Sequence, residues 1–97
     1  MTFVQVMTFK TGDIDAARKL DDQWRQATEG KRTLRHEVLA RDREHPGRYA
    51  VLAYFDSYEE AMRNSELPET RAAAQDFQRL SEEPMTFWNL EVLEDRA

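Results

Sequence analysis

The sequence contains no cysteine and only three glycines and three prolines among its 97 residues. The lack of cysteine excludes disulfide bonds, thiolate nucleophiles and cysteine-ligated zinc or iron–sulfur sites. No apolar run approaches the roughly 20 residues needed to span a bilayer, and no basic region followed by an apolar stretch opens the sequence. We therefore expect a cytoplasmic protein that has no membrane partner.

Positive charge is also scarce. Fourteen Lys and Arg residues stand against 19 Asp and Glu residues, which leaves a net charge of −5. A locally basic stretch runs from Lys31 to Arg48, but Glu37, Asp42 and Glu44 interrupt it. Because nucleic-acid binding usually needs an uncompensated basic face, we expect no nucleic-acid partner.

The length and composition fit a single domain over residues 1–97. Apolar residues make up 40% of the chain, which is enough for one compact core and too much for a disordered tail. The glycines and prolines fall between patterned segments, where they mark turns. No internal repeat or linker divides the sequence.

Four segments have the composition and alternation of β-strands: Thr2–Lys10, Thr33–Glu44, Tyr49–Phe55 and Met85–Leu93. The second is rich in polar residues and is predicted to lie at a sheet edge. The third is the most apolar and is predicted to lie centrally.

Helices are predicted between these strands. Asp13 or Thr11 can cap the first one, and apolar residues follow at helical spacing. Ser57 to Glu60 forms a capping box that starts the second. Pro68 interrupts it, because the residue before a proline disfavours helical geometry, and Glu69–Leu80 continues as a further helix. The order β-α-β-β-α-β, with a broken second helix, predicts an α+β sandwich of the ferredoxin-like kind.

Alternation along the strands gives the predicted sheet two apolar faces. One would hold Val4, Val6, Leu34, Val38, Leu52, Tyr54, Trp88, Leu90 and Val92. The other would hold Phe3, Met7, Phe9, Leu39, Tyr49, Val51, Ala53, Phe55, Phe87 and Leu93. One helix layer covers only one face, and the pattern does not say which. Because the uncovered face would expose a large apolar patch, we expect it to pack on a second copy of the chain as a homodimer.

The second of these faces also holds polar residues, namely Gln5, Arg35, Glu37, Asn89 and Glu91. Buried polar groups need hydrogen-bond partners. These residues fit either the polar lining of a ligand pocket or a network at an interface or sheet edge, and the sequence leaves both interpretations open.

Two segments resemble a known family. Phe55 to Pro68 has an aromatic residue at the end of a strand, an acidic-Ser step, a helix start that contains Ala, and an Asn before the Pro. Leu34 to Leu39, followed by Pro46 to Tyr49, is the second segment. Here the chain resembles the dimeric α+β barrel superfamily, specifically proteins like the antibiotic biosynthesis monooxygenases. The resemblance implies two four-stranded sheets packed into a barrel across a dimer, with a pocket between sheet and helices in each subunit.

Three polar residues are candidate catalytic groups. His36 could act as a general base, because the pKa of histidine lies near neutrality, or it could be a packed histidine at a strand edge. Asn64 could orient a ligand or bind a developing oxyanion through its amide, or it could cap the break between two helices. Tyr54 could donate a hydrogen bond to a substrate carbonyl.

Four aromatic residues are candidate ligand-binding groups: Trp24, Trp88, Phe55 and Phe77. Aromatic side chains can line a pocket for a flat polycyclic molecule, and they equally fill cores.

These features support three functions. The first is a homodimeric barrel that binds a small molecule, for which a small aromatic compound is the candidate ligand. The second is a cofactor-independent monooxygenase that acts on an aromatic or polyketide-like substrate. The third is a non-catalytic structural or partner-binding dimer. The sequence contains no spacing of His, Asp or Glu residues that is typical of a metal site. The resemblance implies that haem-degrading members of the family carry a haem-binding histidine on the helix that corresponds to residues 69–80, and this sequence has no histidine there. We therefore expect no metal and no cofactor.

Overall fold

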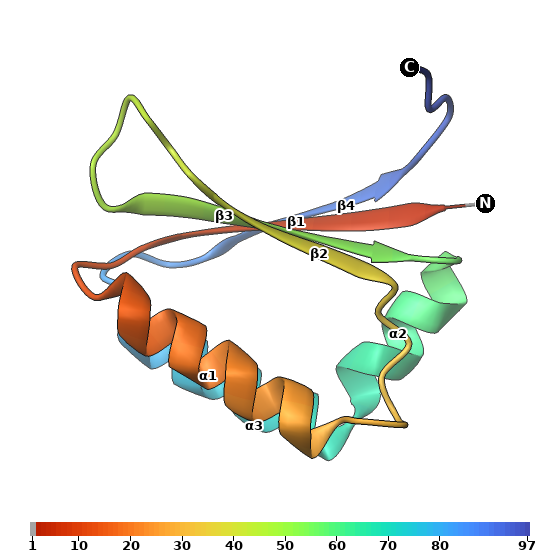
Figure 1. Cartoon of the computed structure of the whole chain (residues 1–97), viewed down its shortest axis with the longest axis horizontal. Coiled ribbons are helices and arrows are strands. Elements are labelled where there is room, and N and C mark those ends of the chain that lie inside the picture. The colour runs from red at the N-terminus through yellow and green to blue at the C-terminus, as the bar shows by residue number, and fades with distance from the viewer. Residues whose placement is uncertain (1) are drawn as a thin grey trace.

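The structure, a computed structural model, describes residues 2–97 and contains four strands and three helices. In chain order these are β1 (Phe3–Lys10), α1 (Ile14–Ala27), β2 (His36–Arg41), β3 (Arg48–Phe55), α2 (Tyr58–Glu66), α3 (Pro68–Leu80) and β4 (Thr86–Glu91). The strands form one layer and the three helices lie together on one side of it (Figure 1). The ferredoxin-like α+β prediction, with its broken second helix, is confirmed.

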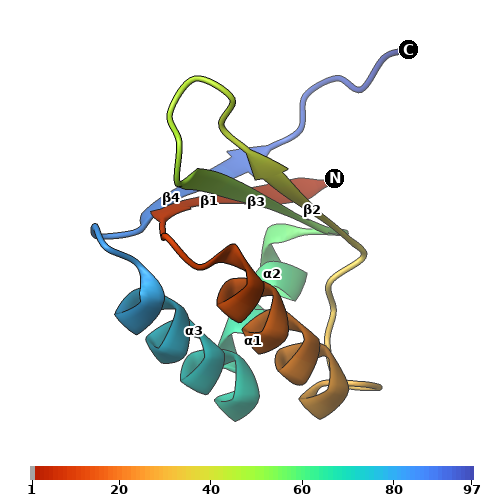
Figure 2. The same cartoon turned by 60° about the vertical axis from the view of Figure 1, so that its left-hand side comes forward.

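The sheet is antiparallel and has the strand order β2-β3-β1-β4. β1 and β3 are therefore central, and β2 and β4 form the two edges. This agrees with the sequence, in which the polar second strand was expected at an edge and the apolar third strand inside. Figure 2 shows α1 and α3 running side by side below the sheet.

Both edge strands are shorter than predicted. β2 covers only His36–Arg41, because Thr33 leaves the sheet and bonds to α2 through both its backbone N–H and its hydroxyl. After Asp42 the chain turns, and the Asp42 carboxylate accepts from a backbone N–H two residues later. β4 ends at Glu91, so Leu93 lies beyond the sheet and is exposed.

The helices cover the sheet face that contains Phe3, Met7, Phe9 and Phe55, which settles the choice that the sequence left open. Leu34 is an exception to the predicted pattern. It was placed with Val38 by alternation, but it precedes β2, and its side chain packs against the core on the helix side.

Side-chain caps begin two of the helices. The Asp13 carboxylate accepts from the Ala16 N–H at 3.1 Å at the start of α1. The Ser57 hydroxyl accepts from the Glu60 N–H at 3.2 Å at the start of α2. The reciprocal half of the capping box is absent among the described residues, because the Glu60 carboxylate pairs with Arg63 at 2.8 Å. Pro68 is the first residue of α3 and needs no N–H donor there.

The core lies under the sheet, where β1, β3 and α2 meet. Phe3, Ala53, Phe55 and Ala61 are buried together, and Met7, Leu34 and Met62 pack against them. Burial of apolar area at this junction holds α2 close to the sheet. α1 and α3 contribute only one fully buried residue between them, Ala17, so the space beneath the rest of the sheet is less tightly filled.

The Ser57 cap predicts the effect of a substitution on stability. Ser57→Ala removes the acceptor of the Glu60 N–H and should lower the free energy of unfolding by about 1 kcal/mol. Ser65→Ala is the matched control. The Ser65 hydroxyl bonds back to carbonyls of its own helix, so its loss should change stability by less than about 0.5 kcal/mol. Urea unfolding of both variants measures this, and an equal loss in the two would contradict a capping role for Ser57.

Candidate functional site

A cavity of about 350 Å³ lies between the helix layer and the sheet. This volume falls within the usual range for small-molecule sites. The walls are mainly apolar and aromatic, and a few polar residues from α1, α2 and the strands interrupt them. Apolar and aromatic lining includes Met7, Phe9, Trp24, Leu34, Val51, Phe77 and Phe87.

One row of residues across the sheet supplies polar groups to the cavity floor. Strand pairing aligns Glu37 with Ala53, Ala53 with Gln5, and Gln5 with Asn89. The Gln5 Nε2 donates to Asn89 Oδ1 at 3.1 Å, and this bond orients the Gln5 amide. Glu37 and Gln5 stand two strand spacings apart, about 10 Å. Because the residue between them is only an alanine, the floor has room between its two polar positions.

Aromatic residues form the walls. The Trp24 Nε1 donates to Thr70 Oγ1 at 2.9 Å, which joins α1 to α3 and fixes the plane of the indole. Phe77 of α3 meets Phe9 of β1 edge-to-face, with ring centroids 5.9 Å apart. The indole N–H is satisfied within the protein, so Trp24 offers a ligand its ring surface and its shape.

Asn64 of α2 is only 6% exposed and lines the cavity. Its Oδ1 accepts from the Thr33 backbone N–H at 3.2 Å. A backbone N–H can only donate, so this bond requires the oxygen of the amide to point toward Thr33. The NH2 group carries no hydrogen bond within residues 2–97 and is left to serve as a donor. The alternative interpretation of Asn64 as a cap at the helix break is not supported, because Leu67 occupies the cap position between α2 and α3 and the Asn64 side chain bonds to Thr33 instead.

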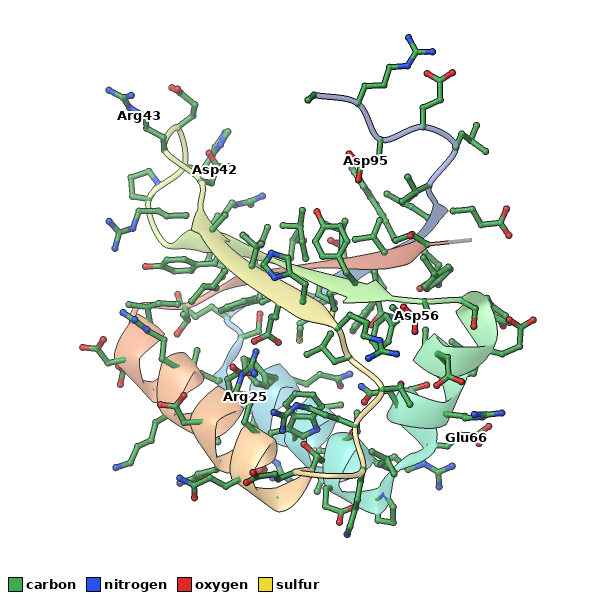
Figure 3. All side chains as sticks on the ribbon, turned by 45° about the vertical axis from the view of Figure 1, so that its right-hand side comes forward. Arg25, Asp42, Arg43, Asp56, Glu66 and Asp95 are labelled. Atoms are coloured by element: carbon green, nitrogen blue, oxygen red, sulfur yellow. The ribbon has the colours of Figure 1, made fainter. Side chains whose placement is uncertain are left out.

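Three charged residues meet where α1 crosses β2. The Arg25 guanidinium donates to Glu37 Oε1 at 3.1 Å and to Asp21 Oδ2 at 3.3 Å. Figure 3 shows Arg25 between α1 and the sheet. The Glu37 side chain is only 16% exposed. Burial, and then a hydrogen bond from protonated Glu37 to the neighbouring Asp21 carboxylate, raise the pKa of Glu37 to about 7, against the lowering effect of Arg25.

The seven residues that the sequence analysis selected as candidate catalytic or ligand-binding groups fall into two sets in the structure. Trp24, Phe55, Asn64 and Phe77 line the cavity, although Phe55 is mainly a core residue at 3% exposure.

His36, Tyr54 and Trp88 lie on the opposite face of the sheet and do not line this cavity. The physical reason is strand alternation. Even-numbered residues of these strands point away from the helices, and odd-numbered ones point toward them. His36 and Tyr54 are cross-strand partners there, with ring centroids 5.5 Å apart. Their catalytic roles stay predictions.

The sequence analysis did not select Asp21, Arg25 and Glu37 as a site. Glu37 did carry a signal, because it belonged to the polar set on an otherwise apolar face. Asp21 and Arg25 are one helical turn apart, a spacing that is ordinary on solvated helices. Of the same polar set, Arg35 instead pairs with Asp56 at the surface.

Within residues 2–97, no three His, Asp or Glu side chains gather as a metal site would require. None of the helices α1, α2 and α3 is long and apolar enough to cross a bilayer.

No protein-family model matches the chain, and the search of curated proteins finds no relative. Solved structures do match. One is a mutant form of SnoaB, a cofactor-independent oxygenase from Streptomyces nogalater, with a TM-score of 0.81, 14% identity, and coverage of 97% of this chain and 95% of that one. Another is Rv0793 from Mycobacterium tuberculosis, with a TM-score of 0.79, 15% identity and full coverage of both chains.

A third solved structure is named an antibiotic biosynthesis monooxygenase. Its TM-score is 0.75 at 13% identity, over 97% of this chain and 100% of that one. At such identities the likeness concerns the fold, and it extends over essentially the whole chain. The chain thus has the ferredoxin-like α+β fold of the antibiotic biosynthesis monooxygenase structures.

Proposed function

We propose that the cavity binds a small, flat and mainly apolar molecule that carries polar groups at its edge. The observation that supports this most is the Asn64 amide, which is buried, turned by its bond to Thr33, and left with an unused NH2 donor. The Asn64 NH2 is not among the fully enclosed unpaired polar atoms of residues 2–97, so an acceptor on a ligand in the cavity can reach it. The aromatic walls formed by Trp24 and Phe77 suit a planar ring system.

The protein is further proposed to be a homodimer through the open face of the sheet. One row of this face runs Val38, Leu52, Val6 and Trp88, and the next runs His36, Tyr54, Val4 and Leu90. Trp88 is 62% exposed and Leu90 is 42% exposed. An exposed apolar sheet face of this kind favours association, and a two-fold dimer covers it with one self-complementary patch.

A second candidate function is cofactor-independent oxygenation of a weakly acidic aromatic substrate. The Asn64 NH2 favours it, because a donor in an apolar cavity stabilises an oxyanion that forms when such a substrate loses a proton. The SnoaB neighbour is itself a cofactor-independent oxygenase. The ionised substrate can reduce oxygen directly. In the balanced reaction, a ring CH2 and O2 give a ring C=O and water, so one oxygen atom enters the product and the other leaves as water.

Ligand binding can be tested with a panel of bicyclic and tricyclic aromatic ketones and phenols. We expect members of the panel to raise the thermal unfolding midpoint of the wild-type protein. Asn64→Asp keeps an acceptor for the Thr33 N–H but removes the NH2 donor, so it should weaken ketone binding about tenfold. Ser65→Ala, on the same helix but exposed, serves as the control and should bind as the wild type does. If no compound shifts the midpoint at millimolar concentration, the binding proposal is wrong.

The dimer can be tested by light scattering at micromolar concentration. The wild-type protein should have twice the 11.5 kDa mass of the chain. Trp88→Glu places a charge on the β4 side of the open face and should give monomers, because a carboxylate is costly to bury without a partner. Ala72→Glu, on the exposed side of α3, should remain dimeric. A wild-type monomer would contradict the proposal.

Oxygenation can be tested by oxygen uptake with tricyclic phenols that contain an activated CH2 group. Asn64→Asp should lower the rate by about a hundredfold, because it replaces the donor by a negative charge beside the substrate anion. Ser65→Ala should leave the rate unchanged. Uptake that is equal in wild type and Asn64→Asp would remove Asn64 from the mechanism, and uptake no faster than in buffer would remove the oxygenase candidate altogether.

A further inference from the structure

The cluster of Asp21, Arg25 and Glu37 is a polar group in the cavity that the proposed function does not yet use. Glu37 and Asp21 both line the cavity, and Arg25 holds the two carboxyls from one side. Arg18 and Asp22 of α1 are the other charged lining residues. The lining residues of β1, β3, α2 and α3 carry no charge, and His36, next to Glu37 in sequence, faces the opposite side of the sheet.

Glu37 and Asp21 lie close together, because the same Arg25 guanidinium donates to both carboxyl groups, and the proximity of Asp21 is one cause of the raised pKa of Glu37. One proton between them lets a carboxyl donate to a carboxylate, which removes the repulsion of two like charges. When that proton leaves, two negatively charged groups face each other, and Arg25 supplies only one positive charge for both. A hydrogen-bond donor on a ligand would then take the place of the lost proton.

We infer that Glu37 is the acceptor for a weakly acidic hydroxyl group on the bound ligand, with Arg25 as the residue that positions it. This deepens the proposed binding function and rests on it. In the ground state the ligand hydroxyl donates to the Glu37 carboxylate. If the proton transfers, the O–H bond of the ligand breaks, a new O–H bond forms on Glu37, and the ligand keeps the negative charge. No electron acceptor or donor is required for this step.

The Glu37 acceptor and the Asn64 donor together restrict the chemistry of the ligand more than the shape of the cavity does. Asn64 offers a donor near the α2 end, and Glu37 offers an acceptor at the α1 end. Asn64 bonds to Thr33, and Glu37 follows Thr33 by four positions, which span at most about 14 Å. The matching ligand is therefore an aromatic molecule with a hydroxyl on one edge and a carbonyl on another, such as a hydroxylated polycyclic ketone.

The direction in which ligand affinity changes with pH follows from the requirement that the Glu37 carboxyl group be ionised. An ionised carboxylate accepts a hydroxyl proton strongly, whereas a protonated one already shares its proton with Asp21. Because the pKa of Glu37 is about 7, affinity for a hydroxyl ligand should rise as the pH increases from 5.5 to 8.5.

The test uses 2-naphthol and its methyl ether, 2-methoxynaphthalene, as matched probes. They have the same ring system, and only the first has a hydroxyl proton to donate. Titration of the full-length protein, followed by tryptophan fluorescence or calorimetry, should show 2-naphthol affinity rising about tenfold between pH 5.5 and pH 8.5. The affinity of the ether should stay the same within about twofold.

Two variants separate a binding role from a structural one. Glu37→Gln should remove the pH dependence for 2-naphthol and leave binding of the ether intact, while Glu94→Gln, at an exposed position, should behave as the wild type does. Arg25→Met should move the midpoint of the pH profile upward, because it removes the charge that favours ionised Glu37. This shift can be read even if Glu37→Gln fails to fold.

The outcomes are distinct. If both probes bind and their pH profiles coincide, Glu37 is not the hydroxyl acceptor, and the binding function survives without this inference. If the 2-naphthol profile is present in the wild type and persists in folded Glu37→Gln, another group titrates and the inference is wrong. If neither probe binds at any pH, the proposed function and the inference that depends on it both fail.

Discussion

The alternation of side chains along four antiparallel strands is the constraint that organises both faces of this protein. Because residues of one parity face the helices and residues of the other face outward, every strand residue is assigned to the cavity side or to the open side by its number. Glu37 and Gln5 thereby belong to the cavity floor, and Trp88 belongs to the open face. A shift of one residue in the pairing would exchange the two sets, which explains why register matters more here than any single contact.

The cavity lies beside the core, where the helix layer does not pack closely against the sheet. The core under β1 and β3 holds α2, through Ala61 against Phe3 and Phe55. The indole of Trp24 is tied to Thr70, which links α1 to α3, and each of these helices reaches the sheet through one contact at the cavity wall, Phe77 with Phe9 and Arg25 with Glu37. Small residues on the facing surfaces, such as Ala53 and Ala73, leave the space unfilled. Empty apolar volume weakens a fold, so a ligand that fills it also stabilises the protein.

The two polar residues to which the proposals assign roles, Asn64 and Glu37, both have partners on other segments of the chain. Asn64 is turned by Thr33, 31 positions away. Glu37 is held by Arg25 across the gap between a strand and a helix. The bond to Thr33 leaves the Asn64 NH2 available as a donor, and burial raises the pKa of the Glu37 carboxyl. The same residues on a solvated surface would be ordinary.

The order and type of the elements could be predicted from the sequence, because hydrophobic periodicity, proline, and capping residues such as Ser57 are local signals. The two apolar faces of the sheet were also predictable, and so was the selection of Asn64, Trp24, Phe55 and Phe77, which line one cavity. The face that the helices cover was not predictable and emerged from the folded chain. That choice separated His36, Tyr54 and Trp88 from the cavity and brought Arg25 and Asp21 to Glu37. Both faces have similar hydrophobicity, so local pattern cannot distinguish them, and the packing of all three helices at once can.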